Sequence, residues 1–254
     1  MTILKSIAVA FSMYSRIPMP HFKWGSEDMK YHLIFFPFVG ALIGLLELLL
    51  RIFYRVYDMP YMAFVALAVA IPLIVTGGFH LDGFMDTSDA LSSWQTKEKR
   101  LEILKDSHIG AFSVIDVLII GLLIVAGIAM MNDAAFSMWC ISFFIARCVS
   151  GIFVVKGQKA KSEGLLHTEA RTASGNIVLG LLIAEAVLSS IAAIVMSPIY
   201  AVVMIIMIGV VAAVYKKVAY DKFGGITGDL AGWFLVNAEV FSGFVLGFMS
   251  LIWR

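Results

Sequence analysis

Seven long apolar stretches alternate with short polar segments along the chain. Each has about the length, roughly 18 residues, from which a transmembrane helix is predicted. Pro60 and Pro198 stand just before two of them, where a helix can begin without losing a hydrogen bond. The predicted spans are 33–50, 61–78, 111–131, 134–155, 176–196, 199–215 and 230–253. We therefore expect an all-α, polytopic transmembrane helical bundle of about seven spans, forming a single domain over residues 1–254.

The first 20 residues carry a shorter apolar pattern. Its helically spaced positions are Ile3, Ile7, Phe11 and Tyr14. The pattern ends at the Pro18 and Pro20 pair, and no small-residue cleavage site follows it, which argues against a signal peptide. We expect an N-terminal interfacial helix lying along the surface of a lipid bilayer.

Composition agrees with a membrane protein. Only 15% of the residues are charged, against roughly 25% in soluble proteins, and the mean hydropathy is +0.93. With seven spans, fifteen of the 19 Lys and Arg residues fall on the same side of the membrane as the N-terminus. Three fall on the opposite side of the membrane, and Arg147 lies within a span. The positive-inside rule places the basic side in the cytoplasm. Nothing in the pattern predicts a nucleic acid partner.

Three aspartates interrupt this apolar chain on the predicted cytoplasmic side. Asp82, Asp86 and Asp89 are spaced i, i+4 and i+7, which places their carboxylates on one face of a helix. Like charges at this spacing repel each other unless a cation offsets them. Carboxylates without clustered Cys or His favour Mg²⁺ or Mn²⁺. The sequence thus predicts an Mg²⁺ site, and the alternative is a solvated acidic helix face.

A second Gly-Gly-x-x-x-Asp motif stands near the C-terminus. Residues 224–232, GGITGDLAG, repeat the pattern of residues 77–82, GGFHLD, and each copy lies where a span meets the cytoplasm. Paired glycines let a backbone approach a ligand closely and expose N–H groups to anions. Asp229 is therefore expected to complete the metal site. The expected substrate-binding residues of the two motifs are Gly77, Gly78, Gly224, Gly225 and Thr227.

Further charged residues gather on the same side. KRLEILKDSHIG, residues 99–110, predicts a short surface helix in which Lys105 and Asp106 are candidate catalytic residues. Glu163 and Arg16 are candidate substrate contacts. Arg147 is expected to point toward the acidic site or a substrate phosphate, because an intramembrane arginine usually faces the bundle interior.

Carboxylates that hold Mg²⁺ beside basic side chains are typical of phosphoryl transfer. His80, close to the first aspartate, is the predicted general base. The predicted catalytic set is His80, Asp82, Asp86, Lys105, Asp106 and Arg147. The predicted metal ligands are Asp82, Asp86, Asp89 and Asp229, with Asp106, Glu163 and Glu239 as further candidates.

These motifs resemble a known family. TGGFHLDGFMDTSDA, residues 76–90, closely resembles the signature of the cobalamin synthase family, the adenosylcobinamide-GDP ribazoletransferases. The similarity continues through LEILKDSHIGAF (101–112), EGL (163–165), GGITGDLAG with Glu239 beyond it, and SRIPMP (15–20), and covers essentially the whole chain. Two positions depart from the pattern: His108 replaces a basic residue that is commonly Arg, and Val236 replaces a residue that is often polar.

The resemblance implies an Mg²⁺-dependent enzyme of the prokaryotic cytoplasmic membrane. Adenosylcobinamide-GDP would react with α-ribazole or its 5′-phosphate in the last assembly step of the nucleotide loop of coenzyme B12. The ribazole hydroxyl would attack the phosphate attached to cobinamide, and GMP would leave. Two kinds of protein partner are compatible with this role: a second copy of the chain in a homo-oligomer, and other B12-assembly enzymes.

Three other protein classes could use the same residues. CDP-alcohol phosphotransferases also carry a membrane-surface aspartate cluster, but their DGxxAR pattern is not matched at residues 82–87. Intramembrane prenyltransferases share only the use of aspartate residues to act on a diphosphate substrate. A cation-coupled transporter would place its charges near the midplane, whereas twelve of the 18 acidic residues here fall on the predicted cytoplasmic side.

Overall fold

The computed structural model describes residues 2–20, 25, 28–106, 108–160 and 175–253. Within these ranges the elements are helices, and no β-strand forms there. They are α1 (Thr2–Tyr14), α2 (His32–Val56), α3 (Tyr61–Thr76), α4 (Phe79–Ser92), α5 (Lys97–Ile103), α6 (Ala111–Met130), α7 (Asp133–Lys156), α9 (Gly175–Met196), α10 (Pro198–Val218), the π-helical η1 (Ala219–Phe223) and α11 (Gly228–Ile252). The predicted all-α class is confirmed.

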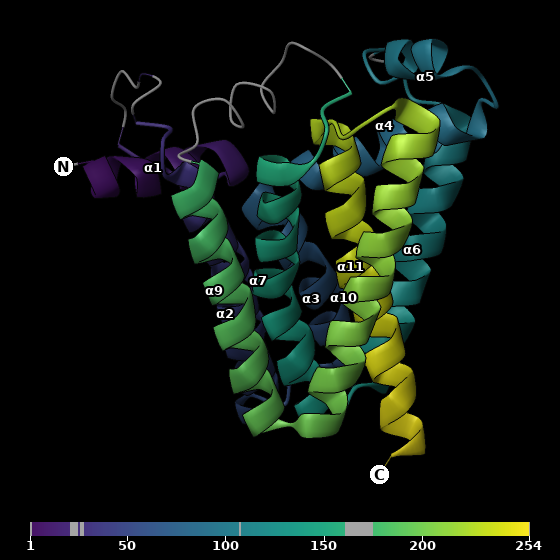
Figure 1. The fold of residues 1–254 in the computed structure, drawn as a ribbon. Coiled ribbons are helices and arrows are strands. Elements are labelled where there is room, and N and C mark those ends of the chain that lie inside the picture. Colours follow the sequence, from purple (N-terminus) through teal and green to yellow (C-terminus); the bar gives the residue numbers. More distant parts are fainter. Residues whose placement is uncertain (1, 21–24, 26–27, 107, 161–174, 254) are drawn as a thin grey trace.

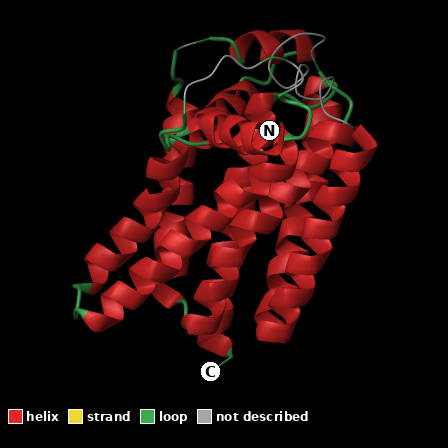
Figure 2. Cartoon of the chain, turned by 90° about the vertical axis from the view of Figure 1, so that its left-hand side faces the viewer, coloured by secondary structure: helices red, strands yellow, loops and turns green. Residues whose placement is uncertain are grey.

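Among the described helices, six are long and apolar enough to cross a membrane alone: α2, α6, α7, α9, α10 with η1, and α11. The remaining predicted span is α3, whose 16 residues make it about 24 Å long at 1.5 Å per residue. The chain then bends by 93° into α4, which turns away from the direction of α3. Figure 2 shows the long helices running side by side, so the predicted bundle of about seven spans is confirmed.

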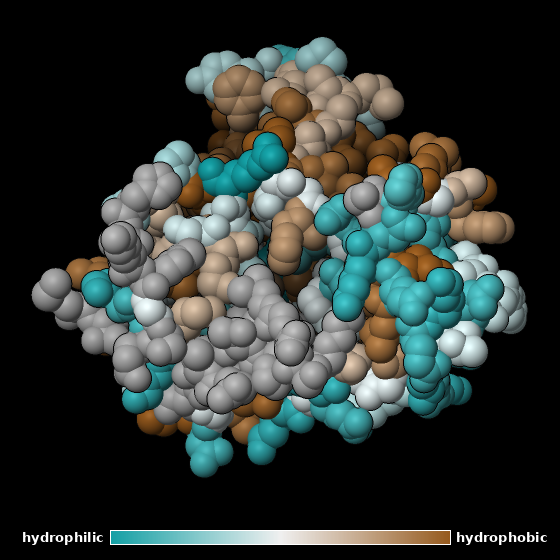
Figure 3. Space-filling model, turned by 90° about the horizontal axis from the view of Figure 1, so that it is seen from above, coloured by the Kyte–Doolittle hydropathy of each residue, from teal (hydrophilic) through white to brown (hydrophobic). Residues whose placement is uncertain are grey.

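The two ends of the bundle differ in character. The spans alternate in direction, and the N- and C-termini lie at opposite ends (Figure 1). Helices α1, α4 and α5 all lie at the N-terminal end (Figure 1). Seen from this end, hydrophilic side chains gather on the side of α5 (Figure 3). At the opposite end, Arg51 and Arg55 of α2 both pair with Asp133 of α7.

Helix α1 lies across the N-terminal end, with one face on the bundle (Figure 1). Val9 is fully buried, whereas Ile3 and Leu4 are 64% and 75% exposed. Tyr14 anchors the C-terminal end of α1 through its ring, whose centroid lies 4.2 Å from that of Phe36 in α2. Exposed apolar side chains on a helix crosswise to the spans fit the predicted interfacial helix.

The core of the bundle surrounds α7. Its membrane-spanning window is 67% buried, more than that of any other described span, whereas the window of α9 is only 17% buried. α7 packs against α2, α9 and α11. A side chain on α7 or on the inner face of α11 therefore lies in the bundle interior, and α9 presents most of its surface outward.

Candidate active site

Gly77 and Gly78 form the sharp turn between α3 and α4. Their φ angles are 68° and 81°, in the left-handed region that costs other residues roughly 1–2 kcal/mol. Both N–H groups donate to the carbonyl of Leu73 and so close α3. α4 begins at the next residue and carries Asp82 in its first turn. In the structure these glycines make the bend, and their predicted contact with substrate stays a prediction.

A second turn of the same kind precedes α11. Gly224 and Gly225, with φ angles of 77° and 155°, end η1. The Thr227 hydroxyl then accepts the N–H of Leu230 at 3.2 Å and caps α11. Asp229 lies in the first turn of α11, where the positive end of the helix dipole stabilises a carboxylate by roughly 0.3–1 kcal/mol. The two repeated motifs thus give the same local structure, a glycine turn followed by a helix with an early aspartate.

The two aspartate-bearing helices cross at glycines. A Cβ atom added to Gly83 would lie 2.8 Å from the carbonyl oxygen of Asp229, and one added to Gly232 would lie 2.8 Å from that of His80. Neither position has room for a side chain, so the backbones of α4 and α11 touch directly. This contact brings Asp229 beside the aspartates of α4.

Three neighbouring aspartates act electrostatically on Asp86. The pKa of Asp86 is raised to about 6, first by partial burial and then by the charges of Asp82, Asp229 and Asp89. A carboxylate perturbed by three like charges lies within a concentration of negative charge that favours a bound cation. The acidic groups predicted to share a site are therefore neighbours in the structure.

The donor set fits a hard cation. Asp82, Asp86 and Asp229 offer only oxygen ligands, which suit Mg²⁺. In the part of the chain that the structure describes, no three His, Cys, Asp or Glu side chains are close enough together to form a preformed metal cage. Mg²⁺ keeps several waters and is commonly held by one or two carboxylates with substrate phosphates. Neighbouring carboxylates without a closed cage agree with that mode of binding.

Asp89 has partners that the sequence did not predict. One of its carboxylate oxygens accepts the N–H of Gly110 at 2.6 Å and the other that of Ser113 at 3.1 Å. Gly110 is the N-cap residue of α6 and Ser113 lies in its first turn, so Asp89 caps α6 from α4. This fixes the start of α6 to the aspartate helix, and a metal-binding role for Asp89 stays a prediction.

His80 lies on the inner face of α4. The residue is only 7% exposed, and its ring packs edge-on against Phe36, with ring centroids 6.0 Å apart. Burial, and then the charge of Arg147, hold the pKa of His80 well below its ordinary value, so the ring is neutral. Because His80 and Asp82 are two positions apart, they point in directions about 200° apart on the helix.

Arg147 has its partner inside the bundle. It is fully buried on α7, and its Nη1 donates to Glu239 Oε1 of α11 at 2.7 Å and to the Phe143 carbonyl at 2.9 Å. Its guanidinium also lies over the ring of Phe36, 5.9 Å from the centroid. Arg147 therefore joins α7 to α11 beneath α4, and contact with a substrate phosphate stays a prediction.

The segment between α5 and α6 presents exposed charges at the N-terminal end. Asp106 Oδ1 lies 2.5 Å from Nδ1 of His108 and also accepts the backbone N–H of His108 at 3.0 Å. These hydrogen bonds lower the pKa of Asp106 and raise that of His108. Lys105 is exposed beside this pair. The predicted substrate contact Glu163 lies outside the described residues.

Arg16 lies against the first glycine turn. Its backbone N–H donates to the Val75 carbonyl at 2.8 Å, and its side chain crosses Gly77, where an added Cβ would meet Arg16 Nε at 2.5 Å. The Arg16 side chain is exposed, with Pro18 and Leu81 lining the same groove. The N-terminal motif is thus fixed to the α3–α4 bend.

Comparison with known proteins identifies the family. The family described as cobalamin-5-phosphate synthase matches residues 6–247, which include every predicted site residue. The chain belongs to this cobalamin-5-phosphate synthase family. No solved structure matches it significantly.

Curated relatives of this cobalamin-5-phosphate synthase family member carry one name. A protein named adenosylcobinamide-GDP ribazoletransferase from Lachnoclostridium phytofermentans is 39% identical over 245 residues, covering 94% of this chain and 92% of its own. Proteins of the same name from Clostridium perfringens strain SM101 and Clostridioides difficile are 34% and 29% identical, and cover 95% and 90% of this chain and 96% and 91% of their own.

Sequence reasoning missed the two glycines on which the site of this cobalamin-5-phosphate synthase family member depends. It assigned importance to the glycine pairs that precede the aspartates, whereas Gly83 and Gly232 make the crossing of α4 with α11. A signal was present, because each lies within three residues of a predicted ligand, Asp82 or Asp229. Small residues let the backbones of two membrane helices approach closely at a crossing.

Proposed function

We propose that the protein is an adenosylcobinamide-GDP ribazoletransferase. It joins adenosylcobinamide-GDP to α-ribazole, or to α-ribazole 5′-phosphate, and forms adenosylcobalamin, or its 5′-phosphate, with GMP. Family membership and the names of the relatives support the reaction. The structural observation that carries the proposal is the crossing of α4 and α11, which brings Asp229 beside Asp82 and Asp86.

The reaction is a displacement at phosphorus. An oxygen of the ribazole sugar bonds to the phosphorus that is attached to cobinamide, and the bond from this phosphorus to the bridging oxygen of GMP breaks. GMP leaves with the electron pair, and the attacking hydroxyl loses its proton. His80 is the predicted base. Its ring is neutral and could accept a proton, but only from a hydroxyl that reaches the inner face of α4, on the side of the helix away from Asp82.

Asp82, Asp86 and Asp229 would hold Mg²⁺, with Asp89 at the edge of the group. When bound, the ion supplies charge neutralisation for the diphosphate oxygens. The chain's own side chains orient the substrate around it. Lys105, which is exposed at the same end of the bundle, is a candidate contact for the diphosphate.

We place the site on the cytoplasmic face of a prokaryotic membrane. The N-terminal end of the bundle carries α4, α5 and the start of α11 (Figure 1). Fifteen of the 19 basic residues belong to sequence segments on this side of the predicted spans. The positive-inside rule orients such an end toward the cytoplasm. Water-soluble nucleotide substrates reach the aspartates directly from there.

A product assay tests this function. The protein is purified into nanodiscs and given adenosylcobinamide-GDP and α-ribazole, and GMP and adenosylcobalamin are followed by chromatography. We expect equal amounts of the two products, formed only with Mg²⁺. The Asp82→Asn and Asp86→Asn variants should insert normally and form neither. If folded wild-type protein makes neither product, also with α-ribazole 5′-phosphate, the proposal is wrong.

A further inference from the structure

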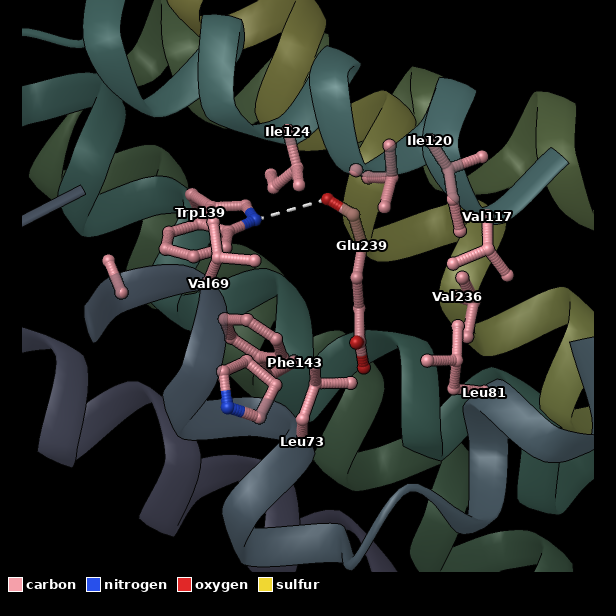
Figure 4. Close-up of a pocket in the computed structure, with 14 residues that line it drawn as sticks. Val69, Leu73, Leu81, Val117, Ile120, Ile124, Trp139, Phe143, Val236 and Glu239 are labelled. Atoms are coloured by element: carbon pink, nitrogen blue, oxygen red, sulfur yellow. Dashed lines mark hydrogen bonds between the residues drawn. The ribbon is translucent and has the colours of Figure 1, made fainter. Parts of the chain in front are cut away.

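A groove and a pocket meet beside the active-site helix. The groove, about 720 Å³ in volume, lies at the N-terminal end and is lined by Arg16, Pro18 and the α3–α4 turn. The pocket, about 240 Å³, lies deeper, among α3, α4, α6, α7 and α11 (Figure 4). Leu73 and Leu81 line both hollows. The two hollows therefore adjoin at these side chains, and together they lead from the bundle end toward the interior.

The pocket exists because α3 is short. α3 ends after 16 residues, and α4 departs at 93°, so protein does not fill the space under α4 and beside α6. On α6 this space meets Gly121, where an added Cβ would find no atom within 4 Å. The neighbouring Leu118 and Leu122 are 62% and 70% exposed, and Leu73 is 40% exposed. The path thus borders a surface that faces hydrocarbon in a membrane.

The lining of the pocket is apolar except at one point. Its walls include Val117, Ile120 and Ile124 of α6 and Trp139 of α7 (Figure 4). The exception is Glu239, whose side chain is 13% exposed and is paired with the fully buried Arg147. Because this pair is neutral as a whole, the pocket suits a hydrocarbon chain.

The entrance of the path, at the bundle end, is charged where the pocket is apolar. Arg16 is exposed there, at the level of the crosswise helix α1, and its backbone is fixed to the end of α3 by the hydrogen bond to Val75. A guanidinium at the membrane surface complements a phosphate, which it binds through paired N–H groups. A cation above an apolar path matches an amphiphile with an anionic head.

We propose that this path is a binding site for an anionic phospholipid. The lipid phosphate lies at Arg16, and one acyl chain passes Leu73 and Leu81 into the pocket. The chain supports the underside of α4, so that a membrane lipid holds the aspartate helix in place. The proposal does not depend on the reaction proposed above, and the predicted contact of Arg16 with a substrate phosphate stays a prediction.

Lipid retention by designed variants tests the proposal. Gly121→Leu fills the pocket from α6, and Gly180→Leu is the matched control, since Gly180 on α9 also has no atom within 4 Å of an added Cβ. The whole protein is delipidated in detergent, and its bound phospholipid and melting temperature are measured with added dioleoyl phosphatidylglycerol or phosphatidylcholine. A ligand of the folded state raises the melting temperature.

We expect wild type and Gly180→Leu to retain phospholipid and to be stabilised more by phosphatidylglycerol than by phosphatidylcholine. Gly121→Leu should lose both effects, and Arg16→Gln should lose the preference for phosphatidylglycerol. Equal lipid retention by Gly121→Leu and wild type would overturn the proposal, as would stabilisation of delipidated wild type by α-ribazole in place of lipid.

A second measurement uses only the wild-type protein, so it tests the proposal even if a variant fails to fold. Phosphatidylglycerol with a photoreactive group at the end of one acyl chain is crosslinked to wild type in nanodiscs, and the labelled peptides are sequenced. Labelling should concentrate at 117–124 of α6 and be competed by unlabelled phosphatidylglycerol. Labelling spread evenly over the outward-facing spans, including α9, would show bulk lipid only and reject the site.

Discussion

Gly83 of α4 lies directly against the backbone of Asp229 on α11. A Cβ at position 83 would stand 2.8 Å from the Asp229 carbonyl oxygen and 2.9 Å from its Cα. One helical turn further along α11, Gly232 meets the backbone of His80 in the same way. The two contacts fix both the spacing and the register of the helices, and hence the position of Asp229 beside the aspartates of α4.

Gly83→Ala should therefore abolish most activity without removing an ionisable group. The added methyl group forces α4 and α11 apart, with an overpacking cost of about 1–3 kcal/mol. A displacement of about 1 Å at a catalytic centre lowers the rate by roughly 100-fold. The measurement is the rate of GMP formation together with the melting temperature in detergent.

Gly180→Ala is the control for this substitution, because its methyl group enters open space on α9. It should leave the rate and the melting temperature unchanged. A Gly83→Ala protein with wild-type activity would show that the crossing does not position the site.

Asp89 and Asp86 should respond oppositely to loss of their charge. Asp89→Ala removes the acceptor of two N–H groups at the start of α6, and loss of a cap costs about 0.5–2 kcal/mol. Asp86→Asn relieves repulsion among the carboxylates and costs no such cap. We expect a lower melting temperature for Asp89→Ala, and an equal or higher one for an inactive Asp86→Asn. The opposite order of stabilities would contradict the capping role.

The Arg147–Glu239 pair should behave as a unit. Removing one partner leaves a buried charge uncompensated, at a cost of about 3–5 kcal/mol, whereas an apolar pair of similar volume is often neutral. Arg147→Met and Glu239→Leu should each lower the melting temperature strongly, and the double variant should recover much of the loss. Additive losses in the double variant would mean that the pair makes no net interaction.

His108 should give the activity a pH dependence. Asp106 raises the pKa of His108, so the cation and its pairing are present below that pKa and are lost as the pH rises through it. If the cation assists the substrate phosphates, wild-type kcat/KM declines on the alkaline side. His108→Arg stays charged there and should extend activity to higher pH, while His108→Gln should have low activity throughout. An identical alkaline decline in wild type and His108→Arg would exclude this role.

The spans could be predicted from sequence because each is a long apolar run, and hydrocarbon requires helical backbone in such a run. The bend after α3 was harder to predict. Gly77 and Gly78 indicated close backbone approach to a ligand, whereas their φ angles show that they turn the chain by 93° into α4. Helical spacing correctly placed the aspartates of α4 on one face, since that relation is local.

What sequence could not supply were the contacts between distant segments. The repeated motif indicated that Asp229 belongs with the aspartates of α4, but not that Gly83 and Gly232 make this possible. Spacing within a helix also gave no partner for Asp89, which is 21 residues from Gly110. Nor did it pair Arg147 with Glu239, 92 residues away.

We propose that Asp229 joins the α4 aspartates in one Mg²⁺-dependent site. The most direct test is the rate of adenosylcobalamin formation at saturating substrates over a range of Mg²⁺ concentrations, for wild type, Asp229→Asn and the control Asp221→Asn on η1. We predict that Asp229→Asn needs at least about tenfold more Mg²⁺ or loses activity, as metal sites do when a supporting group is removed, while Asp221→Asn matches wild type. An Asp229→Asn protein with the wild-type rate and Mg²⁺ dependence would contradict the account.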